Sequence, residues 1–203
     1  MTEKPQTRLF FRKSLPHWEV FGKPIFDTLH LKGSIPEKVL VELKNERETK
    51  LSKANTKKQI EIVRNQFLRI EKYLDCNPKI SWLVEKNIAT YICDCFLEGH
   101  NRKQYVLHAF VVMPNHIHWL YTSLGKENLI TIRNRFKRLT ARKINKVIER
   151  SGSVWMKEGF DHWIRTGLEF ENTINYIERN PVKAGLIKNA KNWKWSSASI
   201  KIK

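Results

Sequence analysis

The chain has 203 residues, 41% of them hydrophobic and 11% aromatic, which suffices for the core of one sizeable domain and excludes a disordered chain. Lysine and arginine number 38 against 20 aspartates and glutamates, a formal net charge of +18 that favours a nucleic acid partner, although charge alone leaves open a basic surface with no specific ligand. No stretch approaches the ~20 apolar residues of a membrane-spanning helix, and the N-terminal segment lacks the apolar core of an export signal.

The first half of the chain is predicted to hold one strand followed by helices. An apolar run over residues 25–31, bounded by glycines and prolines, predicts a strand. A helical segment is expected to open at Ser34 or Pro36. Apolar residues then recur at helical spacing over residues 60–74 and again over residues 82–97. A helical insertion is therefore expected after the first strand.

The second half is predicted to hold a hairpin and two further helices. Residues 104–113 and 116–122 are rich in β-branched and aromatic side chains, and Pro114–Asn115 between them predicts a tight turn. Helical spacing returns over residues 129–150, and a last helix is expected over residues 167–180, stopped by Pro181. This order predicts an α+β fold, an antiparallel sheet with helices packed on one face.

His116 and His118 are the first candidate site residues. They stand two apart on a predicted strand, so both imidazoles should point to the same face, where they can converge on one metal ion. The alternative is a pair of surface histidines, because such a short motif also occurs by chance. Cys76, Cys93 and Cys95 lack the usual zinc spacing and are interpreted as reduced thiols, which indicates a cytoplasmic protein.

Tyr176 is the second candidate. On a helical wheel Ile174 and Ile177 lie on the core side, whereas Tyr176 and Asn180 lie together on the opposite side, one turn apart. A phenol and an amide in this position can act on a group outside the helix, although an exposed tyrosine is also common. The tryptophans of the C-terminal half can stack bases, but a core role is favoured for most of them.

Several motifs in the same order resemble a known family. The segment AFVVMPNHIHWLYT resembles the histidine-hydrophobic-histidine (HUH) hairpin of single-tyrosine transposases, and VWMKEGFDHWIR with INYIERNPVKAGLIKNAKNWKWSSAS resembles their C-terminal half. The motifs are most similar to the REP-associated tyrosine transposase branch, over roughly residues 15–199. The resemblance implies a ferredoxin-like, RRM-like HUH fold. It also implies one domain over residues 1–203, with a flexible arm over residues 1–14 and a tail over residues 196–203.

The resemblance also implies a site. Tyr176 matches the nucleophile, His116 and His118 the metal ligands, and Asn180 the polar residue that completes a Mg²⁺ or Mn²⁺ site. The implied substrate is single-stranded DNA with a hairpin, cut and rejoined through a 5′-phosphotyrosine, by a nucleoid-associated monomer or homodimer. One departure is Asp27, where relatives tend to be apolar; it is expected at a strand edge. DNA phosphates are expected to meet the basic face of the helix over residues 129–150, which carries Arg133, Arg135, Lys137, Arg138, Arg142 and Lys146.

Three alternatives stay open. The chain can keep the fold and bind DNA hairpins without cutting them. It can be a metal-dependent hydrolase in which water is the nucleophile and Tyr176 a bystander. An RNA-binding protein is the third, but it rests on charge alone and leaves the histidine pair unexplained.

Overall fold

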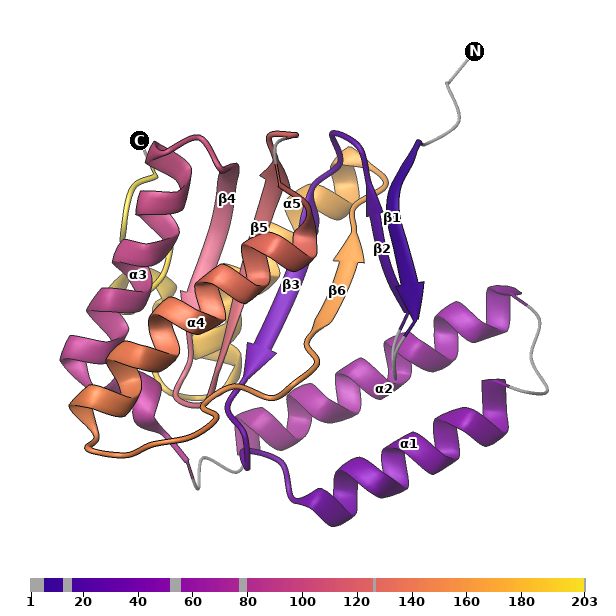
Figure 1. Cartoon of the computed structure of the whole chain (residues 1–203), viewed down its shortest axis with the longest axis horizontal. Helices are drawn as coiled ribbons and strands as arrows, with labels where there is room; N and C mark the ends of the chain where they lie inside the picture. The colour runs from indigo at the N-terminus through magenta and orange to yellow at the C-terminus, as the bar shows by residue number, and fades with distance from the viewer. Residues whose placement is uncertain (1–5, 13–15, 52–55, 77–79, 126, 203) are drawn as a thin grey trace.

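A four-stranded antiparallel sheet forms the centre of the molecule (Figure 1). The computed structural model describes residues 6–12, 16–51, 56–76, 80–125 and 127–202. The strands lie in the order β4-β5-β3-β6. Their bounds are β3 Ile25–His30, β4 Tyr105–Val112, β5 His116–Ser123 and β6 Phe160–Trp163. The expected strand and hairpin are confirmed, and β6 is a strand that the sequence pattern did not predict.

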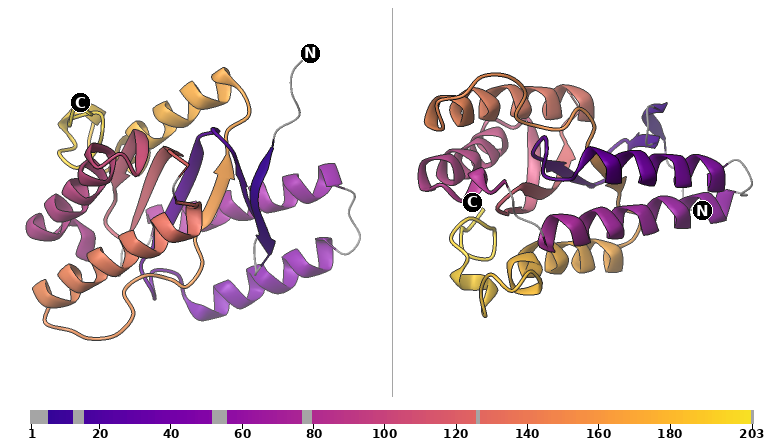
Figure 2. Two further views of the ribbon diagram at one scale, coloured as in Figure 1. Left: turned by 45° about the horizontal axis from the view of Figure 1, so that its top comes forward. Right: turned by 90° about the horizontal axis from the view of Figure 1, so that it is seen from below.

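Helices cover both faces of this sheet, not one face as expected (Figure 2). On one face α3 (Lys86–Asn101) and α4 (Leu129–Val147) pack against the sheet, with Phe96 and Phe136 on the ring of Trp119. On the other face α2 (Thr56–Cys76) and α5 (Gly167–Lys183) form a second core. The sheet therefore separates two environments, and the side of β5 that a residue faces decides its neighbours.

The helical insertion is an antiparallel pair, α1 (Glu37–Leu51) and α2, that runs along the lower edge of the sheet in Figure 1. Arg47 of α1 donates a hydrogen bond to Gln66 of α2 at 3.0 Å. Phe67 joins the pair to the sheet, because its ring stacks on Phe160 at 4.1 Å and meets Phe26 edge-on. We call α1 and α2 the helical arm.

A short hairpin precedes the sheet. β1 (Thr7–Arg12) pairs with β2 (Pro16–Val20), so the expected flexible arm over residues 1–14 is corrected for Thr7–Arg12, and the helical insertion follows the third strand of the chain. His17 and Glu19 of β2 are buried. Glu19 accepts from the backbone N–H of Leu129 at the start of α4, which fastens this hairpin to the helix layer.

Two other expectations are corrected. Asp27 does not lie at a strand edge: β3 pairs with strands on both sides, and Asp27 is fully buried because Arg133 neutralises its charge. Pro181 does not stop α5, which continues to Lys183.

Two short 3-10 turns, η1 (Trp82–Val84) and η2 (Ala190–Asn192), complete the description. Among the described residues, no helix has both the length and the apolar character needed to cross a bilayer.

Candidate active site

The tight turn between β4 and β5 sets the position of the histidine pair. His116 and His118 are both fully buried and point to the face covered by α2 and α5, with ring centroids 4.8 Å apart. Ile117 and Trp119 alternate with them and lie in the core of the opposite face. The strand period of two therefore places both imidazoles on one side, as the sequence predicts.

Neighbouring side chains orient the two imidazoles. The Nδ1 of His116 donates to Asn115 Oδ1 at 2.7 Å, and Asn115 Nδ2 in turn donates to the backbone carbonyl of Leu74 at 3.0 Å. The Nδ1 of His118 lies 2.8 Å from the hydroxyl of Thr28. Both rings are thus held through Nδ1, which leaves each Nε2 for another partner. Burial lowers the pKa of His116 to about 3, so this ring is the neutral form that binds metals.

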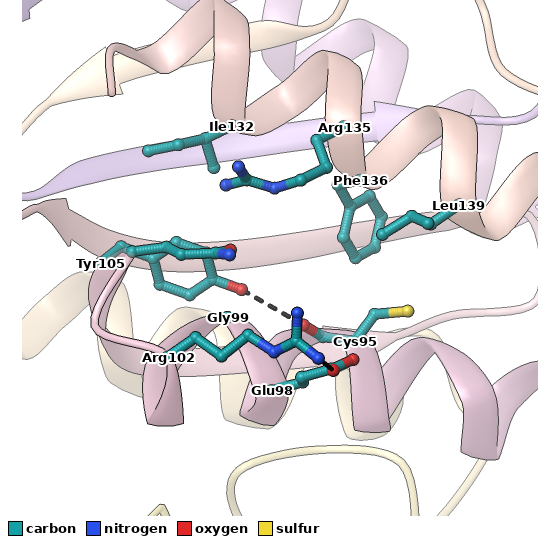
Figure 3. Close-up of a pocket in the computed structure, with 10 residues that line it drawn as sticks. Cys95, Glu98, Gly99, Arg102, Tyr105, Ile132, Arg135, Phe136 and Leu139 are labelled. Atoms are coloured by element: carbon teal, nitrogen blue, oxygen red, sulfur yellow. Dashed lines mark hydrogen bonds and ion pairs between the residues drawn. The ribbon is translucent and has the colours of Figure 1, made fainter. Parts of the chain in front are cut away.

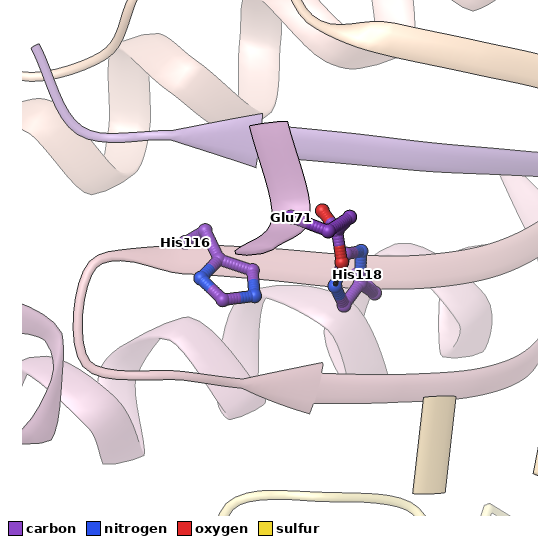
Figure 4. Close-up of side chains that lie close together, drawn as sticks. All are labelled: Glu71, His116 and His118. Atoms are coloured by element: carbon purple, nitrogen blue, oxygen red, sulfur yellow. Dashed lines mark ion pairs between the residues drawn. The ribbon is translucent and has the colours of Figure 1, made fainter. Parts of the chain in front are cut away.

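Glu71 of α2 supplies a third ligand group that the sequence analysis did not identify. Its Oε2 lies 3.1 Å from His118 Nε2, and ligand atoms of Glu71, His116 and His118 all lie within 4.8 Å of one another (Figure 4). Burial alone would raise the pKa of Glu71, but the adjacent His118 and His116 lower it to about 2. One signal was available: Glu71 falls between Phe67 and Leu74 on the apolar stripe of its helix, where a lone carboxylate is costly.

Tyr176 and Asn180 reach the same place from α5. The N-cap residue of that helix is Thr166, whose hydroxyl accepts a hydrogen bond from the backbone N–H of Glu169. The Tyr176 hydroxyl donates to Glu71 Oε2, and its ring meets His118 at 5.5 Å. Burial and the carboxylate of Glu71 hold the pKa of Tyr176 well above its usual range. Asn180, one turn on, is fully buried.

The buried polar atoms of this cluster fit a metal ion. His116 Nε2, one oxygen of Glu71 and the amide atoms of Asn180 are buried without a hydrogen-bond partner, and His118 Nε2 contacts only the carboxylate of Glu71. Unpaired buried polar groups are costly unless a ligand completes them. Two imidazoles, a carboxylate and an amide oxygen form a mixed nitrogen and oxygen set that suits a divalent cation such as Mn²⁺ or Mg²⁺.

The basic residues of α4 lie apart from this cluster, because α4 covers the opposite face of the sheet. Arg133 is not on a solvent face as expected: it is buried, bound to Asp27 at 2.9 Å through two nitrogens and to Asp161 at 2.7 Å. Arg135 pairs with Glu127, and Lys137 donates to backbone carbonyls. The exposed members of the predicted basic face are Arg138, Arg142 and Lys146.

A small cavity between α3 and α4 also lies away from the cluster (Figure 3). Its volume is about 70 Å³, and Arg102, Arg135 and Tyr105 are among its lining residues. Arg102 pairs with Glu98, and Tyr105 donates to the carbonyl of Phe96 at 3.0 Å. These three side chains therefore have partners within the protein, and the cavity is too small for a nucleotide.

The fold is that of a known solved structure. The chain superposes on a structure described as the REP-associated tyrosine transposase bound to a REP hairpin, with a TM-score of 0.53 and 16% identity, over 97% of this chain and 82% of that one. At this identity the likeness establishes the fold, the HUH arrangement of an antiparallel sheet and helices.

Sequence comparison establishes the family. Residues 76–180, about half of the chain, match the family described as Transposase IS200 like, and the chain belongs to that family. A REP-associated tyrosine transposase of Haemophilus influenzae is 30% identical over 99 residues, which cover 44% of this chain and 56% of the relative. Its counterpart in Escherichia coli is 26% identical over 100 residues, 47% and 55% of the two chains. The chain thus spans about half the length of the curated relatives it matches.

Proposed function

We propose that this chain is a tyrosine transposase that cleaves and rejoins single-stranded DNA next to hairpins, with Tyr176 as the nucleophile. The observation that carries the proposal is a shared carboxylate. The hydroxyl of Tyr176 and the Nε2 of His118 both lie against Glu71 Oε2, so the nucleophile and the metal-ligating groups occupy one buried cluster. A tyrosine that merely fills a surface position has no such neighbours.

His116, His118 and Glu71 would hold Mg²⁺ or Mn²⁺, and Asn180 offers a further oxygen. When bound, a divalent ion polarises phosphate oxygens and offsets the negative charge that develops during cleavage. The assignment of Glu71 extends the set expected from the sequence, in which Asn180 completed the site. The buried amide of Asn180 also lies beside the nucleophile Tyr176, one helical turn further along the same face of α5.

The phenolic oxygen of Tyr176 attacks the phosphorus of the DNA backbone and forms a 5′-phosphotyrosine, and the 3′-oxygen leaves. Glu71 accepts a hydrogen bond from this hydroxyl, which orients the phenolic oxygen within the cluster. Attack by a second 3′-hydroxyl reverses the step and joins a new strand. Because the bond energy is kept in the phosphotyrosine, the reaction needs no nucleotide cofactor.

The proposed substrate is a DNA hairpin with a single-stranded flank. Two observations support it: the net charge of +18, and the fold shared with a transposase described as bound to a REP hairpin. We also propose that residues 1–203 form one HUH domain, which acts on DNA in the cytoplasm, at the nucleoid. The proposed phosphate contacts of α4 remain the exposed Arg138, Arg142 and Lys146. Arg135 and Lys137 would join them when DNA displaces their intramolecular partners.

The test is adduct formation. Single-stranded hairpins taken from around the gene are incubated with the protein and Mg²⁺ or Mn²⁺, and protein-linked DNA is sought on a denaturing gel. We expect an adduct that disappears in Tyr176→Phe and with a chelator. Tyr73→Phe, which alters an exposed tyrosine of α2, is the matched control and should keep the adduct.

Two results would change the assignment. Tight hairpin binding with neither adduct nor cleavage, in both metals, would identify a DNA-binding protein that does not cut. Cleavage that persists in Tyr176→Phe would identify a hydrolase in which water attacks.

A further inference from the structure

Lys183 lies in the last turn of α5, on the same face as the nucleophile. Because the helix continues through Pro181, Tyr176, Asn180 and Lys183 follow one another at positions i, i+4 and i+7. The ammonium of Lys183 lies 5.5 Å from the centre of the Tyr176 ring. Its side chain is 50% exposed, so it stands where the buried cluster meets solvent.

A second carboxylate of the helical arm holds Lys183 in this position. Its Nζ lies 3.1 Å from Asp75 Oδ2, and Asp75 is one turn beyond Glu71 on α2. The two helices therefore meet through two parallel contacts, Glu71 with Tyr176 and Asp75 with Lys183. The other oxygen of Asp75 is buried without a hydrogen-bond partner, so this ion pair uses one carboxylate oxygen. The pair is half exposed on the lysine side, so the phosphate of a bound DNA strand can reach the ammonium of Lys183 from solvent.

We propose that Lys183 is a catalytic residue that leaves Asp75 when DNA binds and donates to a non-bridging oxygen of the phosphate that Tyr176 attacks. The inference rests on the proposed function and adds a phosphate-binding cation to it. Attack by tyrosine adds negative charge at the phosphorus, next to the negative charge of Glu71. Among the side chains that the structure places against the ring of Tyr176, which include Phe26 and His118, Lys183 is the cation.

The step balances without a change in the protonation of Lys183. A bond forms between the Tyr176 oxygen and phosphorus, and the hydroxyl proton passes to water. The bond from phosphorus to the 3′-oxygen breaks, and the 3′-oxygen keeps the electron pair and takes a proton from water. Lys183 keeps its three protons throughout and supplies charge and hydrogen bonds to the phosphoryl oxygen.

The test compares charge at one phosphate. The cleaved bond is first mapped with the unaltered protein, and hairpin oligonucleotides are then made with either a phosphate or a neutral methylphosphonate at that bond. Single-turnover adduct formation is measured for the unaltered protein, Lys183→Met, Lys183→Arg and the control Lys188→Met. We expect Lys183→Met to slow reaction at the phosphate by about 10²–10³-fold, the usual effect of removing one oxyanion donor. Lys183→Arg should restore most of the rate, and Lys188→Met should match the unaltered protein.

On the methylphosphonate, Lys183→Met should slow the reaction less than a few-fold, because the charge that Lys183 meets is gone. A second readout avoids chemistry: in the Tyr176→Phe background, the preference for binding phosphate over methylphosphonate should fall when Lys183→Met is added. Thermal melting confirms that each variant is folded.

The outcomes are distinct. Equal slowing of both substrates by Lys183→Met, or no slowing of either, would overturn the role of Lys183 and leave the transposase proposal intact. Absence of any adduct with the unaltered protein would overturn both.

Discussion

Glu71 is a negative charge within an otherwise apolar helix face, and the histidines across from it explain why it is there. Glu71→Gln keeps the shape and removes the charge. We expect it to weaken Mn²⁺ binding by about 10–100-fold, because loss of even an outer-sphere partner has this effect at metal sites. Isothermal titration of Mn²⁺ measures it. Glu61→Gln, an exposed position of the same helix, is the control and should bind as the unaltered protein does.

An unchanged affinity in Glu71→Gln would show that Asn180, not Glu71, completes the ion site. In that case Asn180→Ala should lose the affinity instead. Both residues are fully buried, so each variant needs a melting curve beside the titration.

His17 gives the fold a pH dependence. Burial alone would lower its pKa, but the carboxylates of Asp161 and Glu158, one at each ring nitrogen, raise it to about 9. A pKa raised in the folded state stabilises the protein fully below the unfolded value near 6.5, and this stability is lost as pH rises through about 9. The free energy of unfolding should therefore fall by roughly 2–3 kcal/mol between pH 6 and pH 9.5 from this group.

Urea denaturation at the two pH values, with His17→Gln beside the unaltered protein, isolates the contribution of His17. The variant should show a smaller fall. Parallel pH profiles for the two proteins would contradict the assignment.

Residue-level prediction from sequence succeeded where local period decides the outcome. His116 and His118 share a face because strands alternate, and Tyr176 and Asn180 share a face because helices repeat every 3.6 residues. The expectation that this helix face points away from the core is wrong, because Asn180 is fully buried and Tyr176 packs against the second core. Arg133 shows the limit. Along α4 it cannot be distinguished from Arg138, and only its pairing with Asp27, 106 positions earlier, and with Asp161 draws its side chain into the core. Glu71 was missed for the same reason, since its partners lie on a strand far along the chain.

At the level of elements, the helical arm contributes to the site as well as to the fold. Its docking onto the sheet uses Phe67, Glu71 and the Asn115 contact to Leu74. An ion shared by Glu71 and the two histidines of β5 would join the arm to the sheet. Bound at about 100 times its Kd, such an ion adds about 2.7 kcal/mol to folded-state stability.

Hydrogen exchange tests this link. Addition of Mn²⁺ should slow amide exchange over residues 61–76 much more than over α4, and Glu71→Gln should abolish the difference. Mass spectrometry of peptic fragments provides the measurement. Equal protection of both helices, or protection of neither, would mean that the ion does not join the arm to the sheet.

The elements that sequence analysis identified are those with a strong local signal. The β4-β5 hairpin combines β-branched residues with Pro114–Asn115, and the amphipathic helices repeat their apolar residues. β6 was not predicted because it has four residues and buries Asp161, a charge neutralised by Arg133. β2 was not predicted because it buries His17 and Glu19. Buried charged or polar residues interrupt the inward face of each strand, so alternation of apolar residues could not reveal them.

At the scale of the whole molecule, one chain assembles the complete candidate site. Glu71, His116, His118 and Tyr176 come from α2, β5 and α5 of the same chain, so no partner subunit is needed to complete the cluster. The exposed cations of α4 lie on the other side of the sheet, behind the core around Trp119. A DNA strand that contacts both the tyrosine cluster and the cations of α4 has to pass around an edge of the sheet. The bound strand must therefore be long enough to reach from one face of the sheet to the other.

The net charge of +18 predicts that DNA binding depends strongly on salt. Each phosphate neutralised on a single strand contributes about −0.7 to the slope of log affinity against log salt concentration. If Arg138, Arg142 and Lys146 each meet a phosphate, then changing all three to Gln should reduce the slope in magnitude by about 2. The background for this measurement is Tyr176→Phe, so that cleavage does not interfere, and fluorescence anisotropy between 50 and 300 mM KCl gives the affinities.

A matched triple variant, with Lys38, Lys44 and Lys50 of α1 changed to Gln, removes the same charge from another exposed helix. General attraction between a cationic protein and DNA would reduce the slope equally in both variants. Specific contact at α4 requires a larger reduction there than at α1, because counterion release counts phosphates that are actually met. If the two triple variants have equal salt slopes, DNA makes no specific contact with α4. The DNA-binding surface would then be the face of α2 and α5, where the tyrosine and the histidines lie.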